Sequence, residues 1–228
     1  MLEQFDVLLF DADRTLFDTA AMETEALQKL METLGYSFPE TMPQQYYEIN
    51  EGLWRRIETG ELTRDFVRVE RFRQLLEKYG IHEDPEQTNA TYLSIFERCN
   101  RLIDGAELVC KTLQKEKQLA IITNGSASVQ RTRFALASIT PCFSHVFVSE
   151  ELGISKPQKE FFQIVQREMN ITDPKRVLIV GDSLTSDIRG GNNAGMPTCW
   201  FNPHGEKNTL GVHCDYEIRR LTDVLSLS

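Results

Sequence analysis

The sequence of 228 residues has few cysteines, no long apolar run and no basic N-terminal start. Its five cysteines are odd in number, spread along the chain and free of any CxxC pair, which argues against a disulfide framework or a zinc knuckle. No apolar stretch approaches the roughly 20 residues that a membrane-spanning helix needs. The N-terminal segment does not have the pattern of a secretion signal. We therefore expect a cytoplasmic protein with reduced thiols and no membrane partner.

Positive charge is also scarce, because 25 Lys and Arg face 34 Asp and Glu, for a formal net charge of −9. An acidic chain without a basic stripe is not expected to bind nucleic acid. The four histidines have no metal-ligand spacing, and no role is assigned to them. A hydrophobic content of 41% is typical of a globular protein, and the length suits one large domain or a core domain with an insertion.

What the chain does have is a series of short, almost wholly apolar segments with the composition of buried strands. Amphipathic helical segments separate the later ones. Alternating strands and helices predict an α/β fold with a doubly wound (Rossmann-like) parallel sheet. The expected strands are residues 6–10, 119–123, 145–148, 177–180 and 198–201, and the expected helices are residues 128–139, 160–169 and 186–194.

The stretch between the first two expected strands follows a different pattern. It contains helical segments whose apolar residues recur at i, i+3, i+4 and i+7, and each segment ends at a glycine. We expect an all-helical subdomain over residues 18–98, inserted into a core formed by residues 1–17 and 99–228. The expected helices of the insertion are residues 22–34, 44–58 and 64–79, followed by Gly35, Gly60 and Gly80.

Two acids, Asp11 and Asp13, follow the first expected strand. Side chains alternate along an extended chain, so residues i and i+2 can share one side. Carboxylates placed together repel each other unless a cation lies between them or one carries a proton. A pair of solvated loop acids would also explain this common pattern.

Three further segments carry polar groups suited to a phosphate and a metal ion. Thr123-Asn124-Gly125 offers a hydroxyl, an amide and free backbone N–H groups, although a turn with a helix cap has the same composition. Lys156, before Pro157, offers a compact positive charge, although most lysines are simply surface residues. The segment Gly181–Asp187 offers carboxylates of the kind that Mg²⁺ prefers, or an acidic helix start.

Taken together, these segments form an ordered set of DxD, TNG, KP and GDSxxSD, and all but Lys156 directly follow an expected strand. Ligands of open α/β sheets bind outside the carboxyl ends of the strands. The ordered set resembles the four motifs of the haloacid dehalogenase-like (HAD) hydrolase superfamily, and the resemblance extends over essentially the whole chain, with the helical insertion as the cap. Within the superfamily, the chain is most similar to the YjjG-type pyrimidine 5′-nucleotidases. The segments that carry this closer similarity are Asp11–Phe17, Asn50–Trp54, Arg71-Phe72, Ile122–Gly125, Gln130 with Arg133, Ser186–Gly195 and Cys199–Asn202.

The resemblance implies a Mg²⁺-dependent phosphatase that hydrolyses phosphate monoesters, most of all pyrimidine nucleoside monophosphates, as a monomer or homodimer. Asp11 would be the nucleophile that forms an aspartyl-phosphate, and Asp13 the general acid and base. The remaining implied roles are phosphate binding by Thr123, Asn124 and Lys156, metal binding by Asp11, the Asp13 backbone carbonyl and Asp182, and orientation of these groups by Asp187.

Several alternatives stay open at this point. The chain could be a sugar-phosphate phosphatase or phosphomutase of the same superfamily, or a non-catalytic regulatory protein on this fold. Asn50, Trp54, Arg71 and Phe72 are candidates for base or sugar contacts, but packing within the helical subdomain would also explain the two aromatic residues, and a solvated helix charge would explain Arg71. Arg14 stands where the superfamily usually has glycine, which is unfavourable if the turn needs a positive φ.

Overall fold

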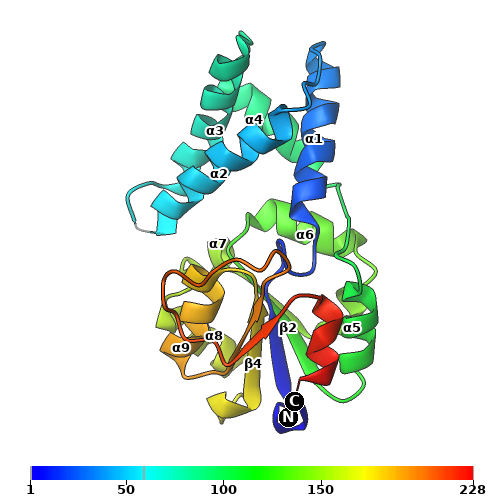
Figure 1. The fold of residues 1–228 in the computed structure, drawn as a ribbon, viewed down its shortest axis with the longest axis vertical. Coiled ribbons are helices and arrows are strands. Elements are labelled where there is room, and N and C mark those ends of the chain that lie inside the picture. Colours follow the sequence, from blue (N-terminus) through cyan, green and yellow to red (C-terminus); the bar gives the residue numbers. More distant parts are fainter. Residues whose placement is uncertain (1, 59, 228) are drawn as a thin grey trace. The chain divides into compact units, whose positions relative to one another are not determined.

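The computed structural model describes residues 2–58 and 60–227. The chain divides into two compact units, one formed by Met1–Asp18 with Asn100–Ser228 and the other by Thr19–Cys99 (Figure 1). We call them the α/β unit and the helical unit. Within the described residues, no helix is both long enough and apolar enough to cross a membrane.

The α/β unit is built on a six-stranded parallel sheet of order β3-β2-β1-β4-β5-β6, which confirms the predicted doubly wound fold. This order reverses direction between β1 and β4, and such a switch point opens a crevice at the carboxyl ends of the two strands. The strands are β1 (Val7–Phe10), β2 (Gln118–Thr123), β3 (His145–Val148), β4 (Val177–Gly181), β5 (Thr198–Phe201) and β6 (Tyr216–Ile218).

Helices cover both faces of the sheet, which is why the strands are apolar throughout. Figure 1 shows α8 and α9 on one face and α5 on the other. Val7 and Leu9 of β1 belong to the core that packs against Phe161 and Phe162 of α8, whereas Phe10 points to the opposite face and its ring contacts Phe143. The helices of this unit are α5 (Ala106–Leu113), α6 (Ala127–Leu136), α7 (Ser149–Leu152), α8 (Lys159–Glu168) and α9 (Arg189–Ala194).

Short helical turns lie in the connections between these strands and helices. The most relevant is η4 (Leu184–Ile188), a single π-helical turn between β4 and α9. The sequence predicts one helix over residues 186–194, where the structure has the end of η4 followed by α9. The other short turns are η1 (Leu2–Gln4), η2 (Thr140–Cys142), η3 (Pro174–Arg176) and η5 (Leu221–Ser226).

The helical unit consists of α1 (Thr19–Leu34), α2 (Met42–Glu58), α3 (Arg64–Tyr79) and α4 (Pro85–Phe96). Helix α3 begins at an N-cap, Thr63, whose side chain accepts a hydrogen bond from the Phe66 N–H, and it ends at Gly80 with φ of +63°. Helix α4 was not predicted, although Asp84 caps it and Pro85 occupies its first turn, which are both helix-start signals.

Arg14 adopts the left-handed conformation, with φ of +61°. It lies in the turn that leaves β1, where the Arg14 N–H donates to the Phe17 carbonyl at 2.9 Å. The turn therefore needs a positive φ at a residue that is not glycine, and a Cβ in this region costs roughly 1–2 kcal/mol.

This conformation predicts that Arg14→Gly is more stable than Arg14→Ala by about 1 kcal/mol. Both variants remove the Arg14 side chain, and only glycine removes the strain of a Cβ at positive φ. Urea unfolding of the two variants, followed by circular dichroism without added metal, measures the difference in unfolding free energy. An alanine variant as stable as the glycine variant would contradict the strain argument.

Candidate active site

The predicted site residues gather at the carboxyl edge of the sheet. Asp11 directly follows β1, Thr123 is the last residue of β2, and Asp182 directly follows β4. These three strands are neighbours in a parallel sheet, so their carboxyl ends meet at the same edge. Lys156 reaches this edge from the loop between α7 and α8.

Lys156 forms the centre of a buried network. Its ammonium donates to Asp11 Oδ1 at 2.6 Å, to Asp187 Oδ1 at 2.6 Å and to the Ile122 carbonyl at 2.8 Å. The side chain is 1% exposed, and the three hydrogen bonds satisfy all three donors of the ammonium. Lys156 is therefore an internal cation, and not a surface lysine.

Asn124 fixes the main chain at Lys156. Its Nδ2 donates to the Lys156 carbonyl and its Oδ1 accepts from the Lys156 N–H, both at 3.0 Å. The peptide bond between Lys156 and Pro157 is cis. The predicted role of Asn124 is to bind phosphate oxygens; in the structure its side-chain amide joins the end of β2 to the loop that carries Lys156.

Thr123 is buried, and its hydroxyl oxygen accepts a hydrogen bond from the Gly125 N–H at 3.0 Å. A hydroxyl also carries one donor, which this contact leaves available. The Thr123 side chain can therefore still donate to an anionic oxygen at the carboxyl edge, as the predicted phosphate-binding role requires.

Asp187 lies in η4 and is almost fully buried. Its Oδ2 accepts from the Ser183 N–H at 3.1 Å, and its Oδ1 accepts from Lys156. A Cβ at Gly181 would lie 2.4 Å from this carboxylate, so only glycine lets Asp187 approach the end of β4. Gly181 is thus needed to position Asp187, and Asp187 in turn helps to position Lys156.

Asp182 is held by contacts to its main chain and its side chain. The indole N–H of Trp200 donates to the Asp182 carbonyl at 2.8 Å, and the Thr15 hydroxyl donates to Asp182 Oδ1 at 3.4 Å. Sequence analysis did not single out Trp200 or Thr15 as contributors to the site. Thr15 belongs to the first motif of the superfamily resemblance and Trp200 to the closer similarity with the YjjG-type nucleotidases, which is the signal that was available.

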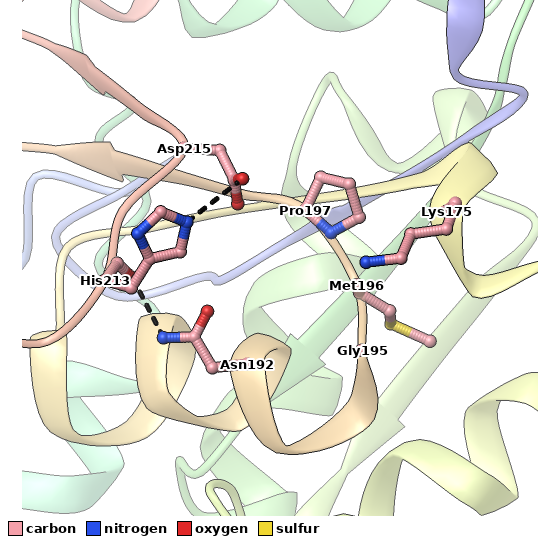
Figure 2. A pocket seen from close by; sticks show the side chains of 7 residues that line it. All are labelled: Lys175, Asn192, Gly195, Met196, Pro197, His213 and Asp215. Atoms are coloured by element: carbon pink, nitrogen blue, oxygen red, sulfur yellow. Dashed lines mark hydrogen bonds and ion pairs between the residues drawn. The ribbon is translucent and has the colours of Figure 1, made fainter.

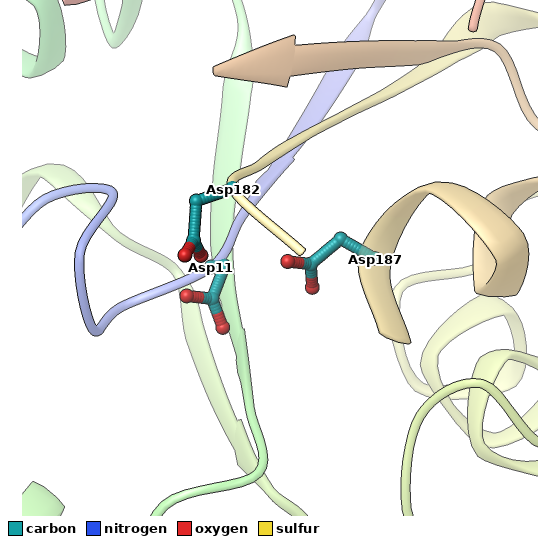
Figure 3. Close-up of side chains that lie close together, drawn as sticks. All are labelled: Asp11, Asp182 and Asp187. Atoms are coloured by element: carbon teal, nitrogen blue, oxygen red, sulfur yellow. The ribbon is translucent and has the colours of Figure 1, made fainter. Parts of the chain in front are cut away.

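The carboxylates of Asp11, Asp182 and Asp187 converge (Figure 3). One oxygen from each lies within 4.8 Å of the others. Among these three carboxylates and the ammonium of Lys156, which pairs with Asp11 and Asp187, negative charge is in excess. Such an excess in a buried place is unfavourable unless protons or a cation balance it.

The pKa values of these groups reflect this imbalance. Burial and the Asp187 carboxylate raise the pKa of Asp182 to about 7, against the opposing charges of Arg14 and Lys156. Burial also raises the pKa of Asp11 well above its usual range, although the Lys156 ammonium opposes the shift. Burial lowers the pKa of Lys156, but Asp11 and Asp187 outweigh it and the net shift is upward.

The chemistry of this donor set fits a small divalent cation. All available ligands are hard carboxylate oxygens, they are few, and they lie at an edge where solvent or substrate oxygens can complete a coordination shell. The group consists of Asp11, Asp182 and Asp187, whereas sequence analysis assigned Asp11, the Asp13 backbone carbonyl and Asp182; the part played by the Asp13 carbonyl stays a prediction.

The Asp13 carboxylate lies outside this acidic group. Gln130 Nε2 donates to its Oδ2 and Arg133 Nη1 donates to its Oδ1, both at 2.6 Å. Both partners come from α6, directly after the TNG segment. The sequence showed Gln130 and Arg133 only as part of a resemblance, and no local pattern linked them to Asp13.

The candidate residues for leaving-group contacts lie in the helical unit. Phe72 is fully buried among Tyr46 and Tyr92, with ring centroids 5.8 and 5.0 Å away, so packing accounts for it. Trp54 is half-buried on α2.

Arg71 and Asn50 are buried polar residues of the same unit. Arg71 donates to Asn89 Oδ1 at 2.8 Å and its guanidinium lies 5.2 Å from the Tyr92 ring, so the interpretation as a solvated helix charge was wrong. Asn50 Nδ2 donates to Glu23 Oε1 at 3.3 Å. Asn50 Oδ1 and Arg71 Nε have no hydrogen-bond partner among the residues that the structure describes.

A hollow of about 360 Å³ lies at the opposite, amino edge of the sheet, beside the start of β5 (Figure 2). Within it, His213 Nε2 lies 3.3 Å from Asp215 Oδ1, and Asn192 Nδ2 donates to the His213 carbonyl at 2.9 Å. None of the predicted site residues lines it. The lining residues are Lys175, Asn192, Gly195, Met196, Pro197, His213 and Asp215.

Several known proteins are similar to this chain over nearly its whole length. The HAD-hydrolase YfnB of Bacillus subtilis (strain 168) is 40% identical over 223 residues, which are 98% of this chain and 95% of YfnB. The pyrimidine 5′-nucleotidase PynA of Streptococcus pneumoniae is 31% identical over 97% of this chain and 94% of PynA. The pyrimidine 5′-nucleotidase YjjG of Escherichia coli is 29% identical over 98% of both chains.

Solved structures show the same fold. The crystal structure of YfnB bound to magnesium has a TM-score of 0.90 and 39% identity, and the match covers 97% of each chain. An L-2-haloacid dehalogenase from Xanthobacter autotrophicus shares the fold at a TM-score of 0.77 and 19% identity, with 98% of each chain covered.

A family model described as haloacid dehalogenase-like hydrolase matches residues 5–195. These residues contain all four predicted motifs, and they include every side chain of the buried network around Lys156. With most of the chain matched by the family model and YfnB aligned over 98% of it, this chain belongs to the haloacid dehalogenase-like hydrolases.

Proposed function

We propose that this chain is a Mg²⁺-dependent phosphatase that hydrolyses pyrimidine nucleoside 5′-monophosphates through an aspartyl-phosphate on Asp11. The observation that carries the proposal is the position of Asp11. Its carboxylate lies at the switch point of the sheet, bonded to Lys156 and converging with two further acids. Pyrimidine nucleotides are proposed as the substrates because the similar proteins PynA and YjjG are both named pyrimidine 5′-nucleotidases.

In the first half of the proposed reaction, an oxygen of Asp11 attacks phosphorus while the bond from phosphorus to the ribose oxygen breaks. Asp13 gives its proton to the departing ribose oxygen. Lys156 orients the Asp11 carboxylate and offsets negative charge at the site, and Thr123 donates to a phosphoryl oxygen. The products are a nucleoside and the aspartyl-phosphate.

In the second half, water attacks phosphorus and the bond to Asp11 breaks. Asp13, now a carboxylate, takes the proton of the attacking water, so inorganic phosphate leaves and both acids return to their starting states. A halide leaving group needs no proton, so the presence of Asp13 favours phosphate ester chemistry over dehalogenation.

Asp11, Asp182 and the Asp13 carbonyl would hold Mg²⁺, with Asp187 orienting Lys156 beside them. When bound, the ion would offset the repulsion between the Asp11 carboxylate and the phosphoryl oxygens. Support comes from the buried carboxylate group and from the magnesium-bound structure of YfnB.

The helical unit is proposed as the cap that selects the leaving group. Its buried Asn50 and Arg71 each retain a polar atom without a partner among the described residues, which is costly unless a ligand or water supplies one. A sugar phosphate is the second candidate substrate, since a glyceraldehyde 3-phosphate phosphatase from Pyrococcus furiosus is 27% identical over 99% of this chain.

The nucleophile assignment predicts that Asp11→Asn lowers phosphate release by about 10³-fold or more, because an amide cannot form the covalent intermediate. Phosphate release from UMP with Mg²⁺ measures this. Asp6→Asn is the matched control. Asp6 is an exposed acid just before β1, and it pairs with Arg176 away from the site. Turnover of Asp11→Asn close to that of the wild type would exclude Asp11 as the nucleophile.

The substrate class is tested with a panel of UMP, dUMP, dTMP, glucose phosphates and phosphoglycolate, each with and without Mg²⁺. We expect the highest kcat/KM for the pyrimidine nucleotides and little turnover without the metal. Faster hydrolysis of a sugar phosphate would favour the second candidate, and conversion of one phosphosugar into another with little phosphate release would indicate a mutase. Loss of turnover on every ester would indicate a non-catalytic protein.

The raised pKa of Asp182 predicts that Mg²⁺ binding weakens by about tenfold between pH 8 and pH 6, because protons occupy the carboxyl group below its pKa of about 7 and ligands must be deprotonated. Calorimetric titration of the metal-free protein measures the affinity. Asp182→Asn should bind Mg²⁺ more weakly at both values and lose the part of the pH dependence that comes from Asp182. Equal affinity of the wild type at the two values would refute the competition between proton and metal.

A further inference from the structure

The Asp13 carboxylate is held at both of its oxygens by one helix. Gln130 and Arg133 are three residues apart on α6, so their side chains leave the same face of the helix. Gln130 donates to Oδ2 and Arg133 to Oδ1, each at 2.6 Å. Rotation of the carboxylate about its own axis would break both hydrogen bonds. We call Gln130 and Arg133 the Asp13 clamp.

The two donors of the clamp are themselves immobilised by packing. Arg133 is fully buried and its guanidinium carbon lies 5.3 Å from the centre of the Phe17 ring. Gln130 is 1% exposed, and a Cβ at Gly125 would lie 2.3 Å from its Nε2. Gly125 therefore leaves the space that the Gln130 amide occupies, and the clamp is tied to the segment that follows β2.

A purely structural explanation covers only part of this arrangement. A buried guanidinium needs a carboxylate partner, and Asp13 supplies one to Arg133. That need does not require a second buried donor on the other carboxylate oxygen. Gln130 has no charge to neutralise, and its Oε1 has no hydrogen-bond partner among the described residues. Burial of this amide therefore lowers stability, which favours a functional role for its contact with Asp13.

We propose that Gln130 and Arg133 are positioning residues, which hold Asp13 in the orientation for proton transfer to the leaving group. This inference rests on the function proposed above, in which Asp13 protonates the departing oxygen. The hydrogen bonds described for the clamp within the site go to the Asp13 carboxylate, so we expect its effect on the proton transfer.

The chemistry of the leaving group supplies the readout. A nucleoside departs as an alkoxide, which needs a proton, whereas p-nitrophenol departs as a stable phenolate, which does not. The ratio kcat/KM reports the steps up to the departure of this group and leaves out hydrolysis of the aspartyl-phosphate. Loss of positioning therefore lowers kcat/KM for UMP much more than for p-nitrophenyl phosphate, while a general loss of structure lowers both.

The test uses two variants. Gln130→Met keeps the length of the side chain and removes its N–H donors. Arg133→Lys keeps the positive charge and removes the planar guanidinium with its set of N–H donors. For each variant we expect kcat/KM for UMP to fall by about 10- to 100-fold and kcat/KM for p-nitrophenyl phosphate by less than about threefold. Arg131→Lys is the matched control, because Arg131 lies on the same helix and pairs with Glu151 at the surface. It should leave both values unchanged.

A double-mutant cycle shows whether the clamp acts through Asp13. In an Asp13→Asn background, Gln130→Met should change kcat/KM for UMP by less than about threefold, since the positioned proton is already absent. Equal losses on the two esters, no loss on UMP, or a further large loss in the Asp13→Asn background would each overturn the proposal.

The wild-type protein separates this inference from the proposed function. If it hydrolyses p-nitrophenyl phosphate with Mg²⁺ but not UMP, the nucleotide assignment fails, and the comparison is made with the alkyl ester of the panel that is hydrolysed fastest. If the wild type hydrolyses neither ester class, the phosphatase proposal fails and the positioning proposal fails with it. If the wild type hydrolyses both esters, and the variants lose kcat/KM equally on UMP and p-nitrophenyl phosphate, only the positioning proposal is contradicted.

Discussion

The rest of the site depends on the two buried ion pairs that the Lys156 ammonium forms with Asp11 and Asp187. A buried charge is costly without partners, so this lysine requires both acids and the Ile122 carbonyl to be in place. Asp11 directly follows β1, Asp187 lies in η4 and Ile122 lies in β2, and Asn124 holds the main chain of the lysine itself. The network can form only when the central strands have paired and their carboxyl ends meet, which links assembly of the site to formation of the sheet.

The same network leaves the site with more negative than positive charge. One lysine faces three converging carboxylates, and the raised pKa of Asp182 is the consequence of burial beside Asp187. A divalent cation would remove this excess, and the local charge would then suit an anionic substrate even though the chain as a whole carries −9. The net charge of a protein therefore says little about the sign of the charge that a substrate meets at a site.

Most of the sheet and the acidic group could be predicted because their signals are local. Buried parallel strands are continuous apolar runs, and the acids that follow them stand out in the sequence. Helices α4, α5 and α7 and strand β6 were not predicted; half of the residues of α4 are polar, α7 has four residues, and β6 has three, one of them Glu217. The contacts of Asn124 with Lys156, and of Gln130 with Asp13, join segments 32 and 117 residues apart, and no spacing rule reports such pairs.

Helix α6 connects two tasks that a phosphate ester hydrolase must coordinate. The segment that leads into it contains Thr123, assigned to the phosphoryl group, and its first turns carry the two side chains that hold Asp13. Gly125 makes this connection compact, because its missing Cβ leaves room for the Gln130 amide. Thr123 ends β2 and the two side chains lie on α6, so the short segment between these elements links the place of the phosphoryl group to that of the proton donor. Geometry of this kind matters for proton transfer, which requires the donor to lie within hydrogen-bond reach of the departing oxygen.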